Sequence, residues 1–220
     1  MISQAEENYL KAIFKITERD GKAASTNAIA AAMNTAAASV TDMLKRLAAK
    51  SLVNYEKSKG ATLTTEGGQL SKLLIRKHRI WEVFLCEKLG YNWDECHELA
   101  EELEHIQSDE LINRLDAFLD KPKFDPHGDP IPDADGHFTI RPQLLLSEMT
   151  HNEKGIVVGV QEHSAAFLQF LDKQKLNLGA RIKVLDVFEF DDSVKILLNE
   201  QTELIVSSKV SQNLFLKKSG

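Results

Sequence analysis

Histidine and carboxylate side chains recur at helical spacing in the segment 93–106. The side chains concerned are His97, Glu101, Glu104 and His105. They occupy positions i, i+4, i+7 and i+8, and helical residues are about 100° apart, so all four fall within a stripe roughly 100° wide. An earlier segment repeats the pattern with His78 and Glu82 at i and i+4. Two antiparallel helices facing each other with these stripes would present nitrogen and oxygen ligands, which suit Mn²⁺ or Fe²⁺ better than a soft ion.

A solvated acidic surface is the alternative interpretation of the glutamates in 98–104. Two His-x-x-x-Glu pairs on neighbouring segments favour a metal site over it. The only cysteines, Cys86 and Cys96, fall outside the ligand spacing, whereas a structural zinc site would more often use cysteine. We therefore interpret both cysteines as small buried residues.

A third group of candidate ligands lies further along, where Asp125 and His127 flank a proline. A carboxylate and an imidazole two residues apart can bind a metal, but Asp-Pro and His-Gly are also ordinary turn-forming pairs. The remaining histidines are isolated in the sequence, and we expect each of them at the surface. They are His137, His151 and His163.

The elements that must position these side chains begin with a helical front part. Helices are predicted from the apolar spacing at 4–18, 26–33, 35–50 and 66–89. The second is built largely of alanine, and Asn34-Thr35 is placed to cap the third. Two apolar runs around a Ser-Lys-Gly tip predict a β-hairpin over 52–64. Helix, short helix, turn, helix and hairpin is the order of a winged helix-turn-helix.

The exposed face of the helix 35–50 carries small hydroxyl and methyl groups that can meet base edges in a DNA major groove. Basic residues on this helix and on the hairpin are placed for phosphate contacts. The predicted DNA-binding residues are Thr35, Ala36, Ala38, Ser39, Thr41, Lys45, Arg46, Lys57 and Lys59. The alternative is a helical bundle whose alanines fill tight contacts, and the hairpin favours DNA binding over it.

Composition agrees with a globular chain of 220 residues, 43% hydrophobic and 27% charged. The net charge of −6 argues against a nucleic-acid partner, but residues 1–75 carry ten lysines and arginines against seven acids. No apolar run is long enough to span a membrane, and the first residues lack the pattern of a secretory signal. We therefore expect a cytoplasmic protein without membrane association.

The second half changes character after two more predicted helices, at 93–106 and 108–119. All five prolines lie between Pro122 and Pro142, which indicates a linker. Short strands follow at 155–160, 181–190, 194–199, 203–206 and 213–217, with one helix at 163–174. We predict a mainly α fold with a small β part: a winged helix-turn-helix at 1–70, a helical metal-binding and dimerisation domain at 71–120, a Pro-rich linker at 121–145 and an SH3-like β-barrel at 146–220.

Three segments together resemble the diphtheria-toxin-repressor family of metal-dependent regulators, including its manganese-transport-regulator branch. They are Glu7-Asn8-Tyr9-Leu10-Lys11-Ala12-Ile13, Arg76-Lys77-His78-Arg79-x-x-Glu82 and Trp93-x-x-x-His97-x-x-x-Glu101-x-x-Glu104-His105. The prolines and glycine of 121–132 also resemble the linker of that family, and the tail resembles its SH3-like (FeoA-like) domain. The resemblance covers 1–132 best.

The resemblance implies a homodimer in which bound metal fixes two winged helices on a palindromic operator. One metal site would use Asn8, Glu101, Glu104 and His105. The other would use His78, Glu82 and His97, completed by Asp125, His127 and Glu162. Glu101 stands where iron-responsive members carry cysteine, and a carboxylate there resembles the manganese branch.

Two positions depart from the manganese branch. Position 8 is Asn where that branch has Asp, and position 11 is Lys where it often has a carboxylate ligand. A charged lysine cannot coordinate a metal, so we expect a one-ion site beside a second, tail-completed site rather than a two-ion cluster.

The predicted function is a manganese-responsive repressor that binds double-stranded operator DNA and controls metal-uptake genes, with no enzymatic activity and no small organic substrate. An iron-responsive repressor with the same ligands is the alternative within this class. A metal-dependent hydrolase is the alternative from another class, because His/Glu helices also bind catalytic ions. No motif places a separate nucleophile or general base, which disfavours the hydrolase.

Overall fold

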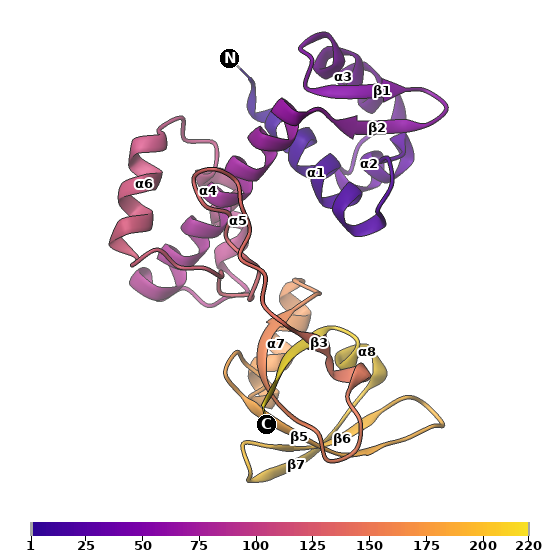
Figure 1. Cartoon of the computed structure of the whole chain (residues 1–220), viewed down its shortest axis with the longest axis vertical. Coiled ribbons are helices and arrows are strands. Elements are labelled where there is room, and N and C mark those ends of the chain that lie inside the picture. Colours follow the sequence, from indigo (N-terminus) through magenta and orange to yellow (C-terminus); the bar gives the residue numbers. More distant parts are fainter. Residues whose placement is uncertain (1, 220) are drawn as a thin grey trace. The chain divides into compact units, whose positions relative to one another are not determined.

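The computed structural model describes residues 2–219, which form two compact units (Figure 1). The first unit contains the chain up to His78 together with Glu101–Asn113 and Pro132–Phe138. The second contains Arg79–Ala100, Arg114–Ile131 and the chain from Thr139 onward. Within residues 2–219, no helix is both long and apolar enough to cross a membrane.

Three helices and a hairpin open the first unit. They are α1 (Gln4–Asp20), α2 (Thr26–Ala32), α3 (Ala37–Ala49), β1 (Val53–Glu56) and β2 (Gly60–Leu63). The two strands pair antiparallel in register, and their tip carries the exposed lysines of the wing (Figure 1). This is the predicted order of a winged helix-turn-helix.

Local side chains define the ends of these helices. Ser3 and Glu6 form a capping box at the start of α1, and Gly21 ends it in the left-handed conformation. The Ser25 hydroxyl caps α2 by accepting from the Ala28 amide. The expected cap of the next helix at Asn34-Thr35 is wrong: α3 begins at Ala37, and its N-cap residue Ala36 has no side-chain oxygen to accept the free amides.

The core of the first unit is built from the apolar stripes of these helices and from the strand residues beneath them. Its fully buried members are Leu10, Ile13, Ala24, Ile29, Val40, Leu44, Leu47 and Ala61. The small residues let the elements pack closely.

The first turn of α4 (Thr65–Leu89) approaches the rest of the unit so closely that a side chain at Gly67 would collide with the Leu52 carbonyl group. α4 is one continuous helix that contributes residues to both units.

The helix predicted over 93–106 is shorter in the structure. Only α5 (Cys96–Leu103) is helical, followed by α6 (Asp109–Phe118). Before it, Asn92 and Glu95 form a turn in which the Glu95 side chain accepts from the Asn92 amide. After it, Glu104 and His105 lie in a turn rather than on the helix. The prediction that four side chains share one helical stripe is therefore wrong for Glu104 and His105.

The tail of the second unit is an antiparallel sheet with the order β3-β8-β4-β5-β6-β7, which curls in Figure 1, and its buried residues form an apolar core. Its strands are β3 (Leu144–Leu145), β4 (Lys154–Val160), β5 (Arg181–Val187), β6 (Val194–Leu198), β7 (Thr202–Val206) and β8 (Leu214–Ser219). The predicted strand 181–190 ends at Val187, where the chain turns. The sequence prediction omitted β3, the 3₁₀ turn η1 (Leu146–Glu148) and the short helix α8 (Ser208–Ser211). The helix α7 (Ala165–Gln174) packs on the core through Phe167, Leu168 and Leu171.

The segment from Pro122 to Pro142 contains no helix and no strand, yet part of it is fixed to the sheet. The Val160 amide of β4 donates to the His127 carbonyl oxygen, and Arg141 donates to the carbonyls of Gly128 and Val158. Gly128 has a φ of +89°, and a side chain there would collide with β4 at Val158 and Gly159. The turn that carries Asp125 and His127 is thereby held against β4.

Candidate metal centres and DNA-binding surface

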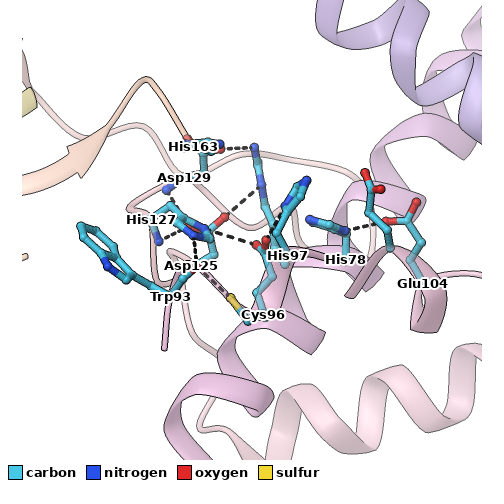
Figure 2. A network of polar contacts seen from close by, with 12 residues as sticks. His78, Trp93, Cys96, His97, Glu104, Asp125, His127, Asp129 and His163 are labelled. Carbon is cyan, nitrogen blue, oxygen red and sulfur yellow. Dashed lines mark hydrogen bonds and ion pairs between the residues drawn. The ribbon is translucent and has the colours of Figure 1, made fainter. Parts of the chain in front are cut away.

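A buried ionic cluster lies in the first unit, where α1 faces the turn that follows α5. The Lys11 Nζ atom is 2.5 Å from Glu104 Oε2 and 3.3 Å from His78 Nδ1. The His78 Nδ1 atom is itself 2.6 Å from the same carboxylate oxygen, and Figure 2 shows the His78 ring directed at Glu104. All three side chains are buried. Charged groups are rarely buried unless they are paired, so this contact fixes all three in place.

The charge state of Glu104 follows from these partners. Burial by itself raises the pKa of this carboxyl group, but the hydrogen bond with His78 and the charge of Lys11 outweigh it and leave the pKa below its ordinary value. Glu104 is therefore a carboxylate at neutral pH, as a metal ligand must be.

The imidazole of His105 is oriented by a glutamate of α1. The His105 Nδ1 atom lies 2.6 Å from Glu7 Oε2, while its Nε2 atom faces the other oxygen of Glu104 at 3.9 Å. Proton donation from Nδ1 to Glu7 leaves the lone pair on Nε2 available, which is the usual arrangement of a metal-binding histidine and its supporting carboxylate.

The two other residues predicted for this site border a cavity of about 490 Å³ beside α1. Asn8 and Glu101 line it together with Lys11 and Lys15. Glu101 is more than half exposed and lies 3.9 Å from the Lys11 ammonium. The cavity thus brings Asn8 and Glu101 together, and Lys11, which also lines it, connects it to Glu104.

A second polar network, in the second unit, is centred on the carboxylate of Glu82 on α4. One oxygen is 3.0 Å from His97 Nδ1, and the other is 3.7 Å from His127 Nδ1. The His127 Nε2 atom lies 2.7 Å from the Trp93 carbonyl oxygen, which accepts its proton. His127 therefore presents Nδ1 toward Glu82, and this carboxylate contacts two imidazoles, those of His97 and His127, which Figure 2 labels. His78 precedes Glu82 by one turn of α4.

Burial and charge oppose each other at His127. Burial lowers the pKa of this imidazole, but its ion pair with Glu82, together with the charge of Asp125, raises it to about 9. The ring is therefore protonated at neutral pH in the metal-free protein. Its positive charge compensates the buried carboxylate of Glu82.

Asp125 builds the turn that carries His127. One of its oxygens accepts from the amides of His127 and Asp129, each at 2.9 Å. The other lies 3.4 Å from the Arg79 guanidinium. Burial, with repulsion from Glu82 and Asp129, raises the pKa of Asp125 to about 7. This carboxyl group therefore keeps its proton to a higher pH than an exposed aspartate does.

Two further residues border this network, and neither was predicted to do so. The ring of His163 lies 5.0 Å from that of His127, so the expectation of an isolated surface histidine at 163 is wrong. Cys96 is fully buried, with a thiol within 4.8 Å of a ligand atom of Glu82 and of His127. Cys86 is only half-buried, which departs from the prediction that both cysteines are buried.

Glu162 lies apart from the contacts around Glu82. Its carboxylate accepts from the Ser164 amide at the start of α7, and it lines a shallow cavity with Phe167 and Lys209. The tail residue placed beside His127 is its neighbour, His163.

The predicted DNA-binding residues lie on an open surface of the first unit. Thr35, Ala36, Ala38 and Ser39 are exposed at the start of α3, and Lys45, Arg46, Lys57 and Lys59 are exposed along it and at the hairpin tip. Thr41 is half-buried and donates its hydroxyl to the Ala37 carbonyl oxygen. Lys45 and Lys59 pair with nearby acids, Asp42 and Glu56. Lys57 is also exposed on the wing and belongs to neither of these two pairs.

Sequence reasoning missed Glu7 and gave Lys11 no partner. A signal was present, since Glu7 and Lys11 are four residues apart and therefore share a face of α1. It also missed Arg79 and Trp93, which contact Asp125 and His127. Trp93 contacts His127 both through its backbone carbonyl group, which leaves no trace in a residue pattern, and through its indole ring, which stacks on the imidazole.

Comparison with known proteins places these features in a family. Residues 1–61 match the iron dependent repressor N-terminal DNA binding domain, residues 64–133 match the iron dependent repressor metal binding and dimerisation domain, and residues 144–218 match the FeoA domain. The chain belongs to the iron-dependent repressor family, which includes the diphtheria toxin repressor. It is thus a metal-dependent DNA-binding repressor with a divalent-metal site.

Individual relatives agree with this assignment. An uncharacterized HTH-type transcriptional regulator of Methanocaldococcus jannaschii is 36% identical over 120 residues, which are 54% of this chain and 96% of the relative. The iron-dependent repressor IdeR of Mycobacterium leprae is 30% identical over 57% of this chain and 54% of its own length, so the match spans about half of that protein. A solved manganese-dependent transcriptional repressor in complex with manganese has a TM-score of 0.89 at 31% identity, covering 97% of this chain and 99% of the other.

Family membership decides between the two classes of function that the sequence left open. The matched domains are those of transcriptional repressors, so the metal-dependent hydrolase is excluded. DNA binding and dimerisation follow from the same domains.

Proposed function

We propose that this repressor responds to Mn²⁺ and, with the ion bound, closes a homodimer onto a palindromic operator that controls metal-uptake genes in the cytoplasm. The observation that carries the proposal is the donor set of the first unit, which consists of carboxylate and imidazole groups around Glu104 and His105. Hard oxygen donors favour Mn²⁺, whereas sulfur donors would favour softer ions. The solved repressor with bound manganese supports the same choice by likeness.

Two sets of residues would hold metal. In the first unit we assign Asn8, Glu101, Glu104 and His105, with Glu7 orienting His105. In the second unit we assign Glu82, His97, Asp125 and His127, with Glu162 as a further candidate. The donors fit a divalent cation because buried carboxylates in both places face imidazole nitrogens at short distance. A bound ion supplies positive charge that holds these side chains together.

The effect of the metal on DNA affinity follows from thermodynamic linkage between metal binding and DNA binding. Metal ligands on α1 belong to the same unit as the recognition surface on α3. A metal strengthens DNA binding only to the extent that it binds the DNA-competent form more tightly. An effect of about 100-fold on operator affinity corresponds to about 2.7 kcal/mol of coupling.

The dimer has an apolar surface available on the second unit. Phe118 of α6 is 66% exposed and Leu89 at the end of α4 is 57% exposed. Phe118 lies 6.5 Å from Phe84, which in turn packs edge-on against Trp81. Exposed aromatic clusters of this kind mark protein–protein contacts more often than free surface.

The test is fluorescence anisotropy on DNA from the chain's own promoter region, with Mn²⁺, Fe²⁺ or Zn²⁺ titrated. We expect tight binding to appear with Mn²⁺ and to be lost in Glu101→Ala. Glu102→Ala is the matched control, because Glu102 is an exposed neighbour on the same helix. Binding that requires Fe²⁺ and ignores Mn²⁺ would establish the iron-responsive alternative, and binding that ignores all metals would reject the switch.

A second measurement tests the wing. Removing the charge in Lys57→Ala should weaken binding to all DNA sequences equally and reduce the slope of log K against log salt by about 0.9. An unchanged slope would show that the hairpin tip does not reach a phosphate.

A further inference from the structure

The two cysteines of this chain lie next to each other in the second unit, although they are ten positions apart. Cys86 follows Glu82 by four residues on α4, so these two side chains share a face of the helix. Cys96 is the first residue of α5, and its thiol lies within 4.8 Å of a ligand atom of Glu82. The thiols of Cys86 and Cys96 contact each other through a hydrogen bond.

The two thiols differ in their access to solvent. Cys96 is fully buried, and its sulfur lies 3.4 Å from the Trp93 carbonyl oxygen (Figure 2). Cys86 is only half-buried, so a small molecule can reach its sulfur. The aromatic surface assigned to the dimer does not cover it, because Phe84 is two residues away and therefore points about 200° around α4 from Cys86.

The chain between the two cysteines permits them to move closer together. Residues 90–92 are exposed and belong to no helix or strand, so they can absorb a small displacement of the start of α5. A disulfide needs a sulfur–sulfur bond of about 2.05 Å, and two thiols already in contact reach that distance by small side-chain rotations.

We propose that Cys86 and Cys96 form a dithiol that hydrogen peroxide and related hydroperoxides oxidise to a disulfide within one chain. The more exposed Cys86 sulfur attacks one peroxide oxygen, the O–O bond breaks, and a sulfenic acid forms as the first water leaves. The Cys96 sulfur then attacks the Cys86 sulfur, the S–O bond breaks, and an S–S bond forms as a second water leaves. Two thiols are oxidised to one disulfide, and one hydroperoxide group is reduced.

The disulfide would form beside the polar network of the second unit. The Cys96 sulfur lies within 4.8 Å of ligand atoms of both Glu82 and His127. The next residue, His97, places its Nδ1 atom 3.0 Å from the Glu82 carboxylate. Drawing Cys96 toward Cys86 therefore changes the position from which His97 reaches Glu82. This effect on metal binding rests on the metal site proposed in the second unit, whereas formation of the disulfide does not.

Oxidation of the metal-free, full-length chain tests the proposal. The protein is treated with hydrogen peroxide, remaining thiols are blocked with iodoacetamide, and the chain is digested with trypsin without reduction. Lys88 lies between the two cysteines, so cleavage after it places Cys86 in peptide 80–88 and Cys96 in peptide 89–114. A disulfide joins these peptides, and non-reducing denaturing electrophoresis distinguishes a bond within one chain from a bond between two chains.

We expect the wild type to lose both thiols, to yield the linked peptides, to migrate as a single chain and to recover both thiols with dithiothreitol. Cys86→Ser should form no disulfide within the chain and should retain the Cys96 thiol. Cys96→Ala should leave Cys86 to oxidise alone. Two intact thiols in the treated wild type, a sulfinic acid on Cys86 beside a free Cys96 thiol, or a disulfide only between chains would overturn the proposal.

A second measurement separates this proposal from the proposed function. After removal of the peroxide, Mn²⁺ is titrated into the oxidised and the reduced wild type, with peroxide-treated Cys86→Ser as the control for oxidation elsewhere. We expect the oxidised wild type to bind Mn²⁺ in the second unit at least about tenfold more weakly, as when the support of a ligand is lost, and dithiothreitol to reverse this. A disulfide with unchanged affinity would overturn the effect on the second unit. A reduced chain that binds no Mn²⁺ would overturn the proposed function and leave the disulfide intact.

Discussion

The two ionic networks of this repressor neutralise buried carboxylates in different ways. In the first unit, Glu104 is compensated by the ammonium of Lys11, which is covalently part of α1. In the second unit, Glu82 is compensated by a proton on His127, whose pKa is raised to about 9. The ammonium of Lys11 forms a direct ion pair with Glu104, whereas a proton on an imidazole can leave when a metal arrives.

This difference assigns different tasks to the two regions. The ion pair of Lys11 and Glu104 joins α1 to the turn after α5 in the metal-free protein. A removable proton keeps a metal-free site folded and then frees the nitrogen lone pair for coordination. On the proposed assignment of ligands, metal binding in the second unit must be coupled to proton release.

The largest expected effect comes from removing the shared carboxylate of the first network. Glu104→Ala leaves the buried Lys11 without its closest anion, and loss of one partner of a buried pair costs about 3–5 kcal/mol. We expect thermal or urea unfolding of the metal-free protein to show this loss, together with loss of metal-dependent operator binding. Glu102→Ala, an exposed glutamate two residues earlier, should leave stability within about 0.5 kcal/mol of wild type. Equal stability of the two variants would contradict the buried pair.

A smaller effect is expected where the first network only orients a ligand. Glu7→Gln retains the size of the side chain but weakens its hold on His105 Nδ1. Loss of such a supporting carboxylate typically lowers metal affinity 10–100-fold. Mn²⁺ titration by calorimetry should show this decrease without a change in stoichiometry. An unaltered affinity would mean that His105 does not bind the ion through Nε2.

The removable proton of the second network predicts a pH dependence. Because His127 is protonated in the metal-free protein below about pH 9, metal must displace a proton, and affinity should rise by up to about tenfold per pH unit between pH 6.5 and 8. Calorimetry in buffers of different ionisation enthalpy should detect the released proton. Its absence in wild type would show that His127 is not a ligand, and His127→Gln should abolish the part of the release due to this residue.

The stability of the metal-free protein should fall as the pH rises, whereas its metal affinity should increase. The pKa of His127 is raised from 6.5 to about 9, so its contribution is complete below pH 6.5 and is lost as the pH rises through 9. The pKa of Asp125 is raised from 3.8 to about 7, so its ionisation also disfavours the folded state as the pH rises toward 7. Unfolding free energies that increase between pH 6 and 9 would contradict these assignments.

The sequence was sufficient for the parts of this molecule that depend on periodicity. Apolar spacing identified the winged helix-turn-helix within a few residues, and His-x-x-x-Glu spacing identified the residues that meet around Glu82 and Glu104. It failed at the end of α5, because Glu104 and His105 continue the helical pattern while the backbone already turns after Leu103. A pattern of side chains does not report where backbone hydrogen bonding stops.

The partners of the candidate ligands were harder to predict, because they depend on tertiary contacts. Lys11 was considered only as a residue unable to bind metal. In the structure its ammonium group is buried and pairs with the carboxylate of Glu104. His163 was considered a surface residue because no histidine or acid repeats near it at helical spacing. Its position beside His127 results from the turn at Gly128 packing on β4, a contact between segments far apart in the sequence.

That packing has a consequence for how the FeoA domain can be exchanged or removed. Gly128 and Gly159 approach so closely that a side chain on the first would collide with the second, and the Val160 amide donates to the His127 carbonyl oxygen. The tail is therefore not an interchangeable module attached to a finished metal-binding domain. A chimaera that takes its tail from a relative must have glycine at both positions. A truncation before β4 removes the strand against which the turn at His127 packs.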